Sequence, residues 1–145
     1  MNRTIQATNY IILAMREKWL NLILDGKKTA EVRRTRPAKA CDMPDYLYLY
    51  HKGCIHGIAE VVGIRLCERA WLDLIYEDYG KDACLSWQEF SLYMATAKAG
   101  VVYRLGKVQR FDTPIPVPCR PQSWQYATPE LLEIIQGRKE KGDKQ

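Results

Sequence analysis

Paired cysteines, long apolar runs and histidines are all scarce in this sequence. No apolar stretch is long enough to cross a membrane, and the first residues carry no signal-peptide pattern. The five cysteines are odd in number and include no C-x-x-C pair, which is typical of free thiols in a reducing compartment. They are Cys41, Cys54, Cys67, Cys84 and Cys119. We therefore expect a cytoplasmic protein without disulfides and without membrane contact.

The scarcity of histidine also argues against a metal centre. The two histidines, His51 and His56, flank Cys54, and no fourth ligand lies at a matching spacing. We expect neither a metal nor a cofactor.

Length and net charge indicate what kind of protein this chain is. Its 145 residues fit one domain and can bury a core without disulfides. The formal net charge of +5 favours anionic partners, with nucleic acid first among them. Nothing in the sequence sets the oligomeric state.

One short stretch, residues 26–33, combines a turn, two cations and a carboxylate. Residues 15–25 have the apolar spacing of an amphipathic helix, and Gly26 follows as the residue that ends it with a positive φ. From residue 29 the pattern has period two, so Glu31 and Arg33 share one face of a strand. On a pocket wall these two side chains can pair or hold a polar ligand. On a solvated strand they are ordinary surface charges.

Basic residues are concentrated around this stretch. Between residues 27 and 39 there are six of them and a single acid, Glu31. The six are Lys27, Lys28, Arg33, Arg34, Arg36 and Lys39. A local patch of this kind indicates a nucleic-acid footprint more strongly than net charge does.

The rest of the chain predicts a small mixed barrel of the α+β class with inserted and flanking helices. Its apolar patterns predict five or so strands in all, and Gly57 and Gly63 favour bulges in one of them. Helical patterns cover 68–76 (with Trp71 buried), 86–97 and 128–137, and four prolines keep 113–121 extended along an edge. We expect a flexible start at 1–9, one domain at 10–137, and a disordered charged tail at 138–145.

The motif and its surroundings resemble one known family. Gly26, Lys28, Glu31 and Arg33 match the G-x-K-x-x-E-x-R signature of the ASCH domain family, which has a PUA-like fold. The order of elements over about residues 10–135 is similar as well. The resemblance implies a cleft at the helix–strand corner that binds RNA or a nucleotide, as a coactivator or regulatory module. Lys28, Glu31 and Arg33 would line that cleft.

Physical chemistry suggests a role for each candidate binding residue. Lys28 offers a point charge for phosphate, and Arg33 offers a fork for phosphate or a base edge. Glu31 can accept a hydrogen bond from an exocyclic amine, as carboxylates do from cytosine N4. Neighbouring cations and aromatic side chains complete the candidate set, the aromatic ones as stacking partners for unpaired bases or simply as core residues. These additional residues are Arg34, Arg36, Tyr48, Tyr50, Trp124 and Tyr126.

Two alternatives stay open. Some relatives are amidohydrolases that act on an N4-acylated cytidine with the motif lysine, a threonine and a glutamate. This chain keeps the lysine as Lys28 but has Glu31 where those relatives have the threonine, so Lys28 and Glu31 are the candidate catalytic residues if this alternative holds. The acid of those relatives could correspond to Glu77, Asp78 or Asp82. The other alternative is a protein-interaction module that uses the proline-rich edge at 113–121.

Overall fold

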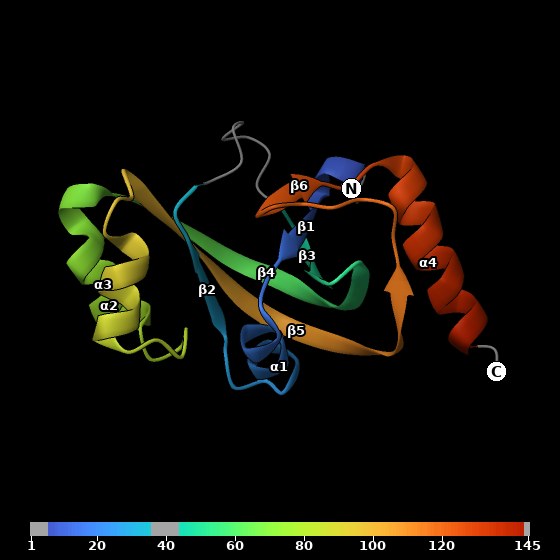
Figure 1. Cartoon of the computed structure of the whole chain (residues 1–145), viewed down its shortest axis with the longest axis horizontal. Coiled ribbons are helices and arrows are strands. Elements are labelled where there is room, and N and C mark those ends of the chain that lie inside the picture. Colours follow the sequence, from blue (N-terminus) through green and yellow to red (C-terminus); the bar gives the residue numbers. More distant parts are fainter. Residues whose placement is uncertain (1–5, 36–43, 144–145) are drawn as a thin grey trace, which may run out of the picture.

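A computed structural model describes residues 6–35 and 44–143 of the chain (Figure 1). Arg36 and Lys39 of the basic patch lie outside these ranges, as do residues 1–5 of the expected flexible start. In chain order the elements are η1 (Ala7–Asn9), β1 (Tyr10–Ala14), α1 (Glu17–Leu24), β2 (Ala30–Arg33), β3 (Tyr46–His51), β4 (Cys54–Glu68), η2 (Arg69–Trp71), α2 (Leu72–Tyr79), α3 (Trp87–Met94), β5 (Ala99–Pro116), β6 (Trp124–Tyr126) and α4 (Pro129–Asp143).

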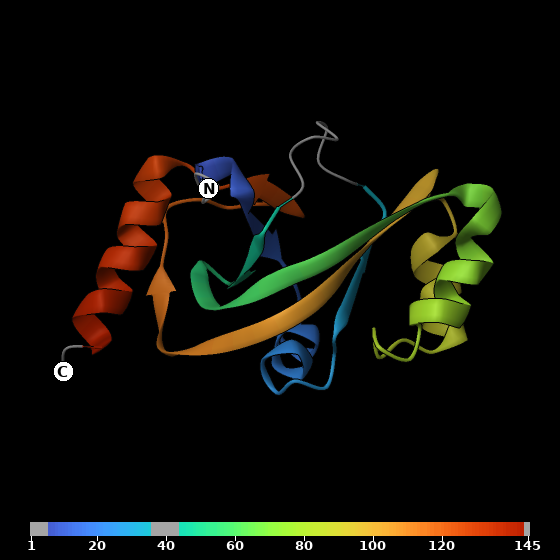
Figure 2. The same cartoon turned by 180° about the vertical axis from the view of Figure 1, so that it is seen from behind.

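The strands of the described residues form one mixed sheet of six, in the order β2-β5-β4-β3-β1-β6. β1 and β3 are parallel, and the other neighbouring pairs are antiparallel. The long strands β4 and β5 run across the molecule, and the sheet curls into a half-barrel (Figures 1 and 2). Helices α2 and α3 are inserted between β4 and β5, and α4 follows the last strand. The predicted α+β fold with a mixed barrel is confirmed.

Strand β3 shows how the sequence pattern divides the core. Leu47 and Leu49 are fully buried in the apolar cluster that includes the inner face of α1. Tyr48 and Tyr50 point to the opposite face, where they are buried with residues of α4. Leucines and tyrosines alternate along this strand, and the alternation places these two tyrosines in the core.

Two of the bulges that bend β4 lie where glycine predicts them. The pairing of β4 with β5 changes register between Ile55 and Gly57 and between Val61 and Gly63, and also between Ala59 and Val61, where β4 has no glycine. At Gly57 a Cβ would lie only 2.5 Å from the backbone oxygen of Gln109, so the two strands approach too closely there for any side chain.

Several predicted helix boundaries differ from the structure, and α3, for example, ends at Met94 rather than at residue 97. β4 continues to Glu68, which pairs with Ala99, so the helix predicted at 68–76 begins at Leu72 instead. Ladder hydrogen bonds of the sheet override helical spacing here, and Trp71, expected in the core, is 58% exposed.

Helix α4 begins as predicted, with Thr128 Oγ1 accepting a hydrogen bond of 3.2 Å from the backbone N–H of Leu131. It ends at Asp143 rather than at Gly137, and thus includes most of the stretch that was expected as a disordered tail. Lysine, arginine and glutamate are good helix formers, and Gly137 here keeps an ordinary negative φ, so the helix continues through it. Residues 144–145 of that stretch lie outside the described ranges.

Candidate functional site

The site begins at the corner between α1 and β2. Gly26 has a φ of +77°, and the backbone N–H groups of Lys27 and Lys28 both donate to the carbonyl of Leu22 at the end of the helix. The carbonyl of Asp82 then accepts from the N–H of Thr29 and of Ala30. The loop between α2 and α3 is thereby attached to the start of β2, where Lys28 turns inward.

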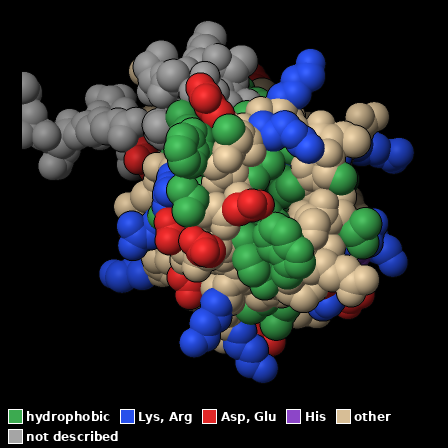
Figure 3. Space-filling model, turned by 90° about the vertical axis from the view of Figure 1, so that its left-hand side faces the viewer, with side chains coloured by type: hydrophobic (Ala, Val, Ile, Leu, Met, Phe, Trp, Pro, Cys, Tyr) green, Lys and Arg blue, Asp and Glu red, His purple; other side chains and the backbone are tan. Residues whose placement is uncertain are grey.

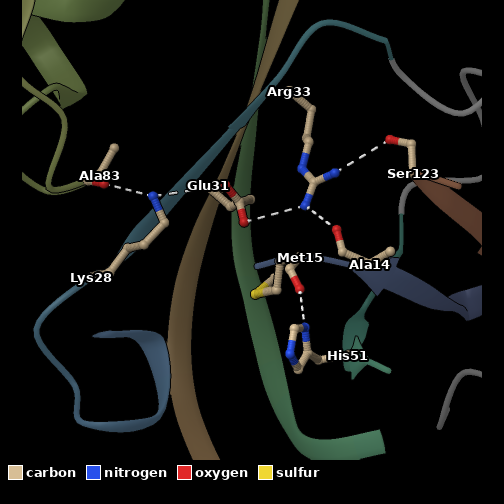
Figure 4. A network of polar contacts seen from close by, with 8 residues as sticks. All are labelled: Ala14, Met15, Lys28, Glu31, Arg33, His51, Ala83 and Ser123. Carbon is tan, nitrogen blue, oxygen red and sulfur yellow. Dashed lines mark hydrogen bonds and ion pairs between the residues drawn. The ribbon is translucent and has the colours of Figure 1, made fainter. Parts of the chain in front are cut away.

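Lys28 has a buried ammonium group. Its side chain is 2% exposed, and Nζ donates a hydrogen bond of 2.6 Å to the carbonyl of Ala83 (Figure 4). Nζ also lies 3.7 Å from Glu31 Oε1 and 5.0 Å from the centre of the Trp19 ring. Burial lowers the pKa of Lys28 below its ordinary value, because the charged form loses water, and the charge of Glu31 opposes that shift.

Glu31 lies between two cations. Its Oε2 is 3.6 Å from Nη2 of Arg33, on the side away from Lys28. The residue is 6% exposed, and Oε2 has no hydrogen-bond partner among the residues that the structure describes. The predicted sharing of one strand face by Glu31 and Arg33 is thus observed as a contact.

Arg33 connects β2 to the other end of the sheet. Nη2 donates a hydrogen bond of 2.7 Å to the carbonyl of Ala14, the last residue of β1, and Nη1 donates one of 3.3 Å to Ser123 Oγ, next to β6 (Figure 4). Beside this group, His51 Nδ1 lies 2.9 Å from the carbonyl of Met15.

These side chains face a pocket of about 390 Å³ between α1, β2 and α3. One wall comes from the end of β1 and from α1, a second from β2, and a third from α3 and the loop before it. The lining residues are Ala14, Met15, Arg16, Trp19, Lys28, Glu31, Val32, Arg33, Leu85, Glu89, Leu92 and Tyr93. At the rim, Lys18 of α1 and Glu89 of α3 form an ion pair of 3.5 Å.

The helical wall of the pocket belongs to a face of mixed character. Helices α2 and α3 form one side of the molecule, where hydrophobic side chains lie at the surface among charged ones (Figure 3). Leu92, which lines the pocket, is 75% exposed, and Trp87 is half exposed. Phe90 and Met94 of the same helix are buried against β2 and β5, so α3 is fixed in place by its inner side.

The remaining candidate residues are dispersed. Arg34 is exposed, with its guanidinium 5.1 Å from the centre of the Tyr93 ring at the pocket wall. Tyr48 and Tyr50 lie in the core cluster against α4, on the far face of the sheet. Trp124 and Tyr126 pack edge to face, with ring centres 5.3 Å apart, against the cluster around α1. These four aromatic residues are not among those that line the pocket.

The pocket also contains residues that the sequence did not single out. Trp19 was expected only as part of an apolar helix stripe, but its ring lies beside Lys28. Tyr93 and Glu89 come from a helix some sixty residues further along the chain, and no local pattern connects them with the motif. Arg16 is exposed at the pocket and precedes α1 directly.

The residues behind the two alternatives are also located. Of the acids expected for a hydrolase, Asp78 pairs with Arg65 and Asp82 contributes its backbone carbonyl, and neither lines the pocket. In the proline-rich edge, β5 extends to Pro116, which pairs with Cys54, and Ile115 is buried. Within the described residues, no three metal-binding groups gather, and no helix is both long and apolar enough to span a membrane.

A curled mixed sheet with a pocket at its helix–strand corner defines a PUA-like α+β domain. The chain belongs to the ASCH domain family, whose pattern it matches over residues 13–103. A comparison with curated proteins finds no match.

Solved structures with the same fold include an ASCH protein from Zymomonas mobilis, which is 20% identical, with a TM-score of 0.77 over 90% of this chain and 95% of that one. A single-residue mutant of that protein gives 20% identity and a TM-score of 0.78 over 92% and 99% of the two chains. The N-terminal domain of Staphylothermus marinus McrB is more distant, at 11% identity and a TM-score of 0.55 over 95% and 98%.

Proposed function

We propose that this ASCH domain binds RNA or a nucleotide in the pocket between α1, β2 and α3, and that it works as a regulatory module in the cytoplasm. The observation that carries the proposal is the presence of Lys28, Glu31 and Arg33 together on the wall of one hollow. A volume of about 390 Å³ fits a nucleotide-sized ligand, since small-molecule pockets span about 300–1,000 Å³. The thiols of Cys54, Cys67, Cys84 and Cys119 are free, which agrees with a reducing compartment.

The distribution of charge and aromatic surface supports a nucleotide. Arg16 and Arg34 are exposed at and next to the pocket, where a phosphate backbone can reach them from solvent. The ring of Trp19 adds aromatic surface to the pocket, with the ammonium groups of Lys18 and Lys28 4.6 and 5.0 Å from its centre. Stacking of a base on an aromatic side chain is worth about 1–3 kcal/mol. A single strand or a free nucleotide fits this arrangement better than a duplex, because a base must leave its stack to enter a hollow.

Salt-dependent binding tests the proposal. A fluorescently labelled oligoribonucleotide of mixed sequence is titrated with the protein at increasing potassium chloride, and mononucleotides are added as competitors. We expect affinity to fall with salt, because each phosphate contact in a single strand contributes about 0.7 to the slope of log K against log salt. The double variant Arg16→Ala/Arg34→Ala removes two such contacts and lowers that slope by about 1.4. The matched control Lys107→Ala removes an exposed cation outside the pocket and leaves the slope nearly unchanged. Affinity that is indifferent to salt and equal in both variants contradicts the proposal.

One observation favours a second candidate, hydrolysis of an N4-acylated cytidine. Burial lowers the pKa of Lys28, so a larger fraction of the amine is neutral and able to act as a base. The described lining of the pocket includes no serine, threonine or cysteine, so water would have to be the nucleophile. The test is chromatography of N4-acetylcytidine after incubation with the protein and with Lys28→Met. Release of acetate and cytidine by the unaltered protein alone supports hydrolysis, and an unchanged substrate excludes it for this compound.

A further inference from the structure

Among the described residues, the two deep cations of the pocket have partners within the protein, whereas one carboxylate oxygen beside them receives no hydrogen bond. Lys28 Nζ already donates to the carbonyl of Ala83, approaches Glu31 and faces the Trp19 ring. Arg33 already donates to Ala14 and Ser123. Both deep cations therefore have protein partners before any ligand arrives.

Glu31 is the exception. Glu31 lines the pocket, and its Oε2 is buried and receives no hydrogen bond from any residue the structure describes. Arg33 Nη2 approaches it to 3.6 Å, which is an ion pair but too long for a hydrogen bond. A buried carboxylate oxygen without a donor is unfavourable, so the pocket gains from a ligand that supplies an N–H there. Figure 4 shows this carboxylate between the two cations, with Lys28 and Arg33 on either side.

The same arrangement disfavours a phosphate at that depth. A phosphate placed beside Glu31 would face a like charge, and the neighbouring cations are already paired with it and with backbone carbonyls. Exposed cations are available instead at Arg16 and Arg34.

This inference rests on the nucleotide site proposed above. We propose that in this site Glu31 Oε2 accepts a hydrogen bond from the exocyclic amino group of a base. The base enters the pocket first, while the phosphate stays at the mouth. The ligand class is accordingly a nucleotide of cytosine, adenine or guanine. Uracil is disfavoured because its N3–H stands between two carbonyl oxygens, which would approach the carboxylate together with the donor.

A series of nucleotides tests this without altering the protein. Binding of cytidine 5′-monophosphate is compared by calorimetry with binding of uridine 5′-monophosphate and of N4,N4-dimethylcytidine 5′-monophosphate, which has no amino hydrogen. We expect each of the latter two to bind about tenfold more weakly, the range that one good base contact provides. The ratio should be the same at low and high salt, because the contact is buried and only the phosphate contacts are screened.

Two matched variants test which carboxylate recognises the base. Glu31→Gln replaces one acceptor oxygen by an amide that can also donate, so we expect the preference for cytidine over uridine to disappear. Glu133→Gln makes the same change at an exposed carboxylate of α4, outside the pocket, and should leave the preference intact. If Glu31→Gln does not fold, the nucleotide series on the unaltered protein still decides the question.

The outcomes separate this inference from the function on which it rests. Equal binding of the three nucleotides, with the salt slope still reduced in Arg16→Ala/Arg34→Ala, overturns the role of Glu31 and leaves nucleotide binding in place. A preference that survives Glu31→Gln does the same. No binding of RNA or of any nucleotide overturns both.

Discussion

Lys28 carries its charge in a place from which water is largely excluded. Its ammonium group is held by a carbonyl and a carboxylate, yet desolvation outweighs them and lowers its pKa from the ordinary value of 10.5. In the window between the folded pKa and 10.5 the unfolded chain binds a proton that the folded chain releases. The contribution of this lysine to stability therefore rises with pH across that window.

The variant Lys28→Met tests this sign. Methionine keeps most of the buried volume and removes the titrating group. At neutral pH we expect a loss of about 1–3 kcal/mol in the free energy of unfolding, since the carbonyl of Ala83 loses its hydrogen-bond donor and Glu31 loses an ion-pair partner. Urea unfolding at several values from pH 7 to pH 10 should show the unaltered protein gaining stability relative to the variant as pH rises. A difference that stays constant or shrinks with pH argues against a depressed pKa.

Gly57 is a second residue whose role is set by its surroundings. A Cβ at this position would lie 2.5 Å from Gln109 O and 2.7 Å from a methyl group of Leu24, so Gly57→Ala forces β4 away from β5. We expect a loss of about 1–3 kcal/mol in urea unfolding, the usual effect of overpacking.

The matched control is the same substitution at Gly137, which has no atom within 4 Å of a Cβ and lies inside α4. There alanine should stabilise the protein by up to about 1 kcal/mol, because glycine is a poor helix residue. If the two substitutions have equal effects, close strand approach at Gly57 is not the reason for glycine there.

Among individual residues, the sequence predicted the site contacts that follow from the alternation of side chains along one strand. Glu31 and Arg33 meet because alternate residues of one strand share a face, and Lys28 joins them through the turn at Gly26. The aromatic candidates show where such reasoning ends. Tyr48 and Trp124 have suitable chemistry, but which sheet face carries the pocket depends on pairings between distant strands.

Helix α3 is the element whose position depends most on its cap. Ser86 Oγ accepts a hydrogen bond of 3.0 Å from the N–H of Glu89, and the Glu89 side chain accepts one of 3.0 Å from the N–H of Ser86. Ser86 and Glu89 stand at the S-x-x-E spacing that is typical of such a capping box. Because Glu89 also lines the pocket, the cap fixes both the start of the helix and one wall of the site.

Ser86→Ala should lower the free energy of unfolding by about 1 kcal/mol, the usual cost of losing an N-cap. The control is Ser91→Ala in the same helix, where the hydroxyl only donates to the carbonyl of Trp87 and the loss of side-chain polarity is comparable. Thermal unfolding followed by circular dichroism compares the two. A larger loss for Ser91→Ala would mean that the cap does not hold the helix start.

Helices and strands were predicted well where neighbouring residues in the sequence determine them, and poorly where pairing with a distant strand determines them. Caps at Ser86 and Thr128 and bulges near Gly57 follow from residue type alone. The stretch after residue 64 has helical spacing, but β5 provides a partner strand as far as Ala99, so β4 continues to Glu68. A hydrogen-bonded neighbour that is distant in sequence was the missing information.

At the scale of the whole molecule, the pocket lies where Arg33 joins one edge of the sheet to the other end of the sheet. Among the residues that the structure describes, β2 and β6 are the two edges of the sheet, and each pairs with a single neighbouring strand. Arg33 spans the gap, since it extends from β2 to the end of β1 and to Ser123 beside β6. The half-barrel could be predicted from the order of strands and the glycine bends, but the closing contact could not, because Ser123 lies ninety positions away.

Arg33→Ala should therefore affect the edges of the sheet more than its centre. We expect a loss of about 1.5–3 kcal/mol in urea unfolding, the range for hydrogen bonds that involve a charged donor. Hydrogen exchange followed by mass spectrometry should quicken at Trp124–Tyr126 and at the end of β1, while the β4–β5 ladder stays protected. Arg34→Ala is the control, because Arg34 is the next residue, carries the same charge and is exposed to solvent. Its unfolding free energy should change by no more than about 0.5 kcal/mol. Uniformly faster hydrogen exchange across all strands, or equal losses of unfolding free energy in both variants, would mean that Arg33 does not hold the two edges together. The packing of α1 and α3 alone would then maintain the shape of the pocket.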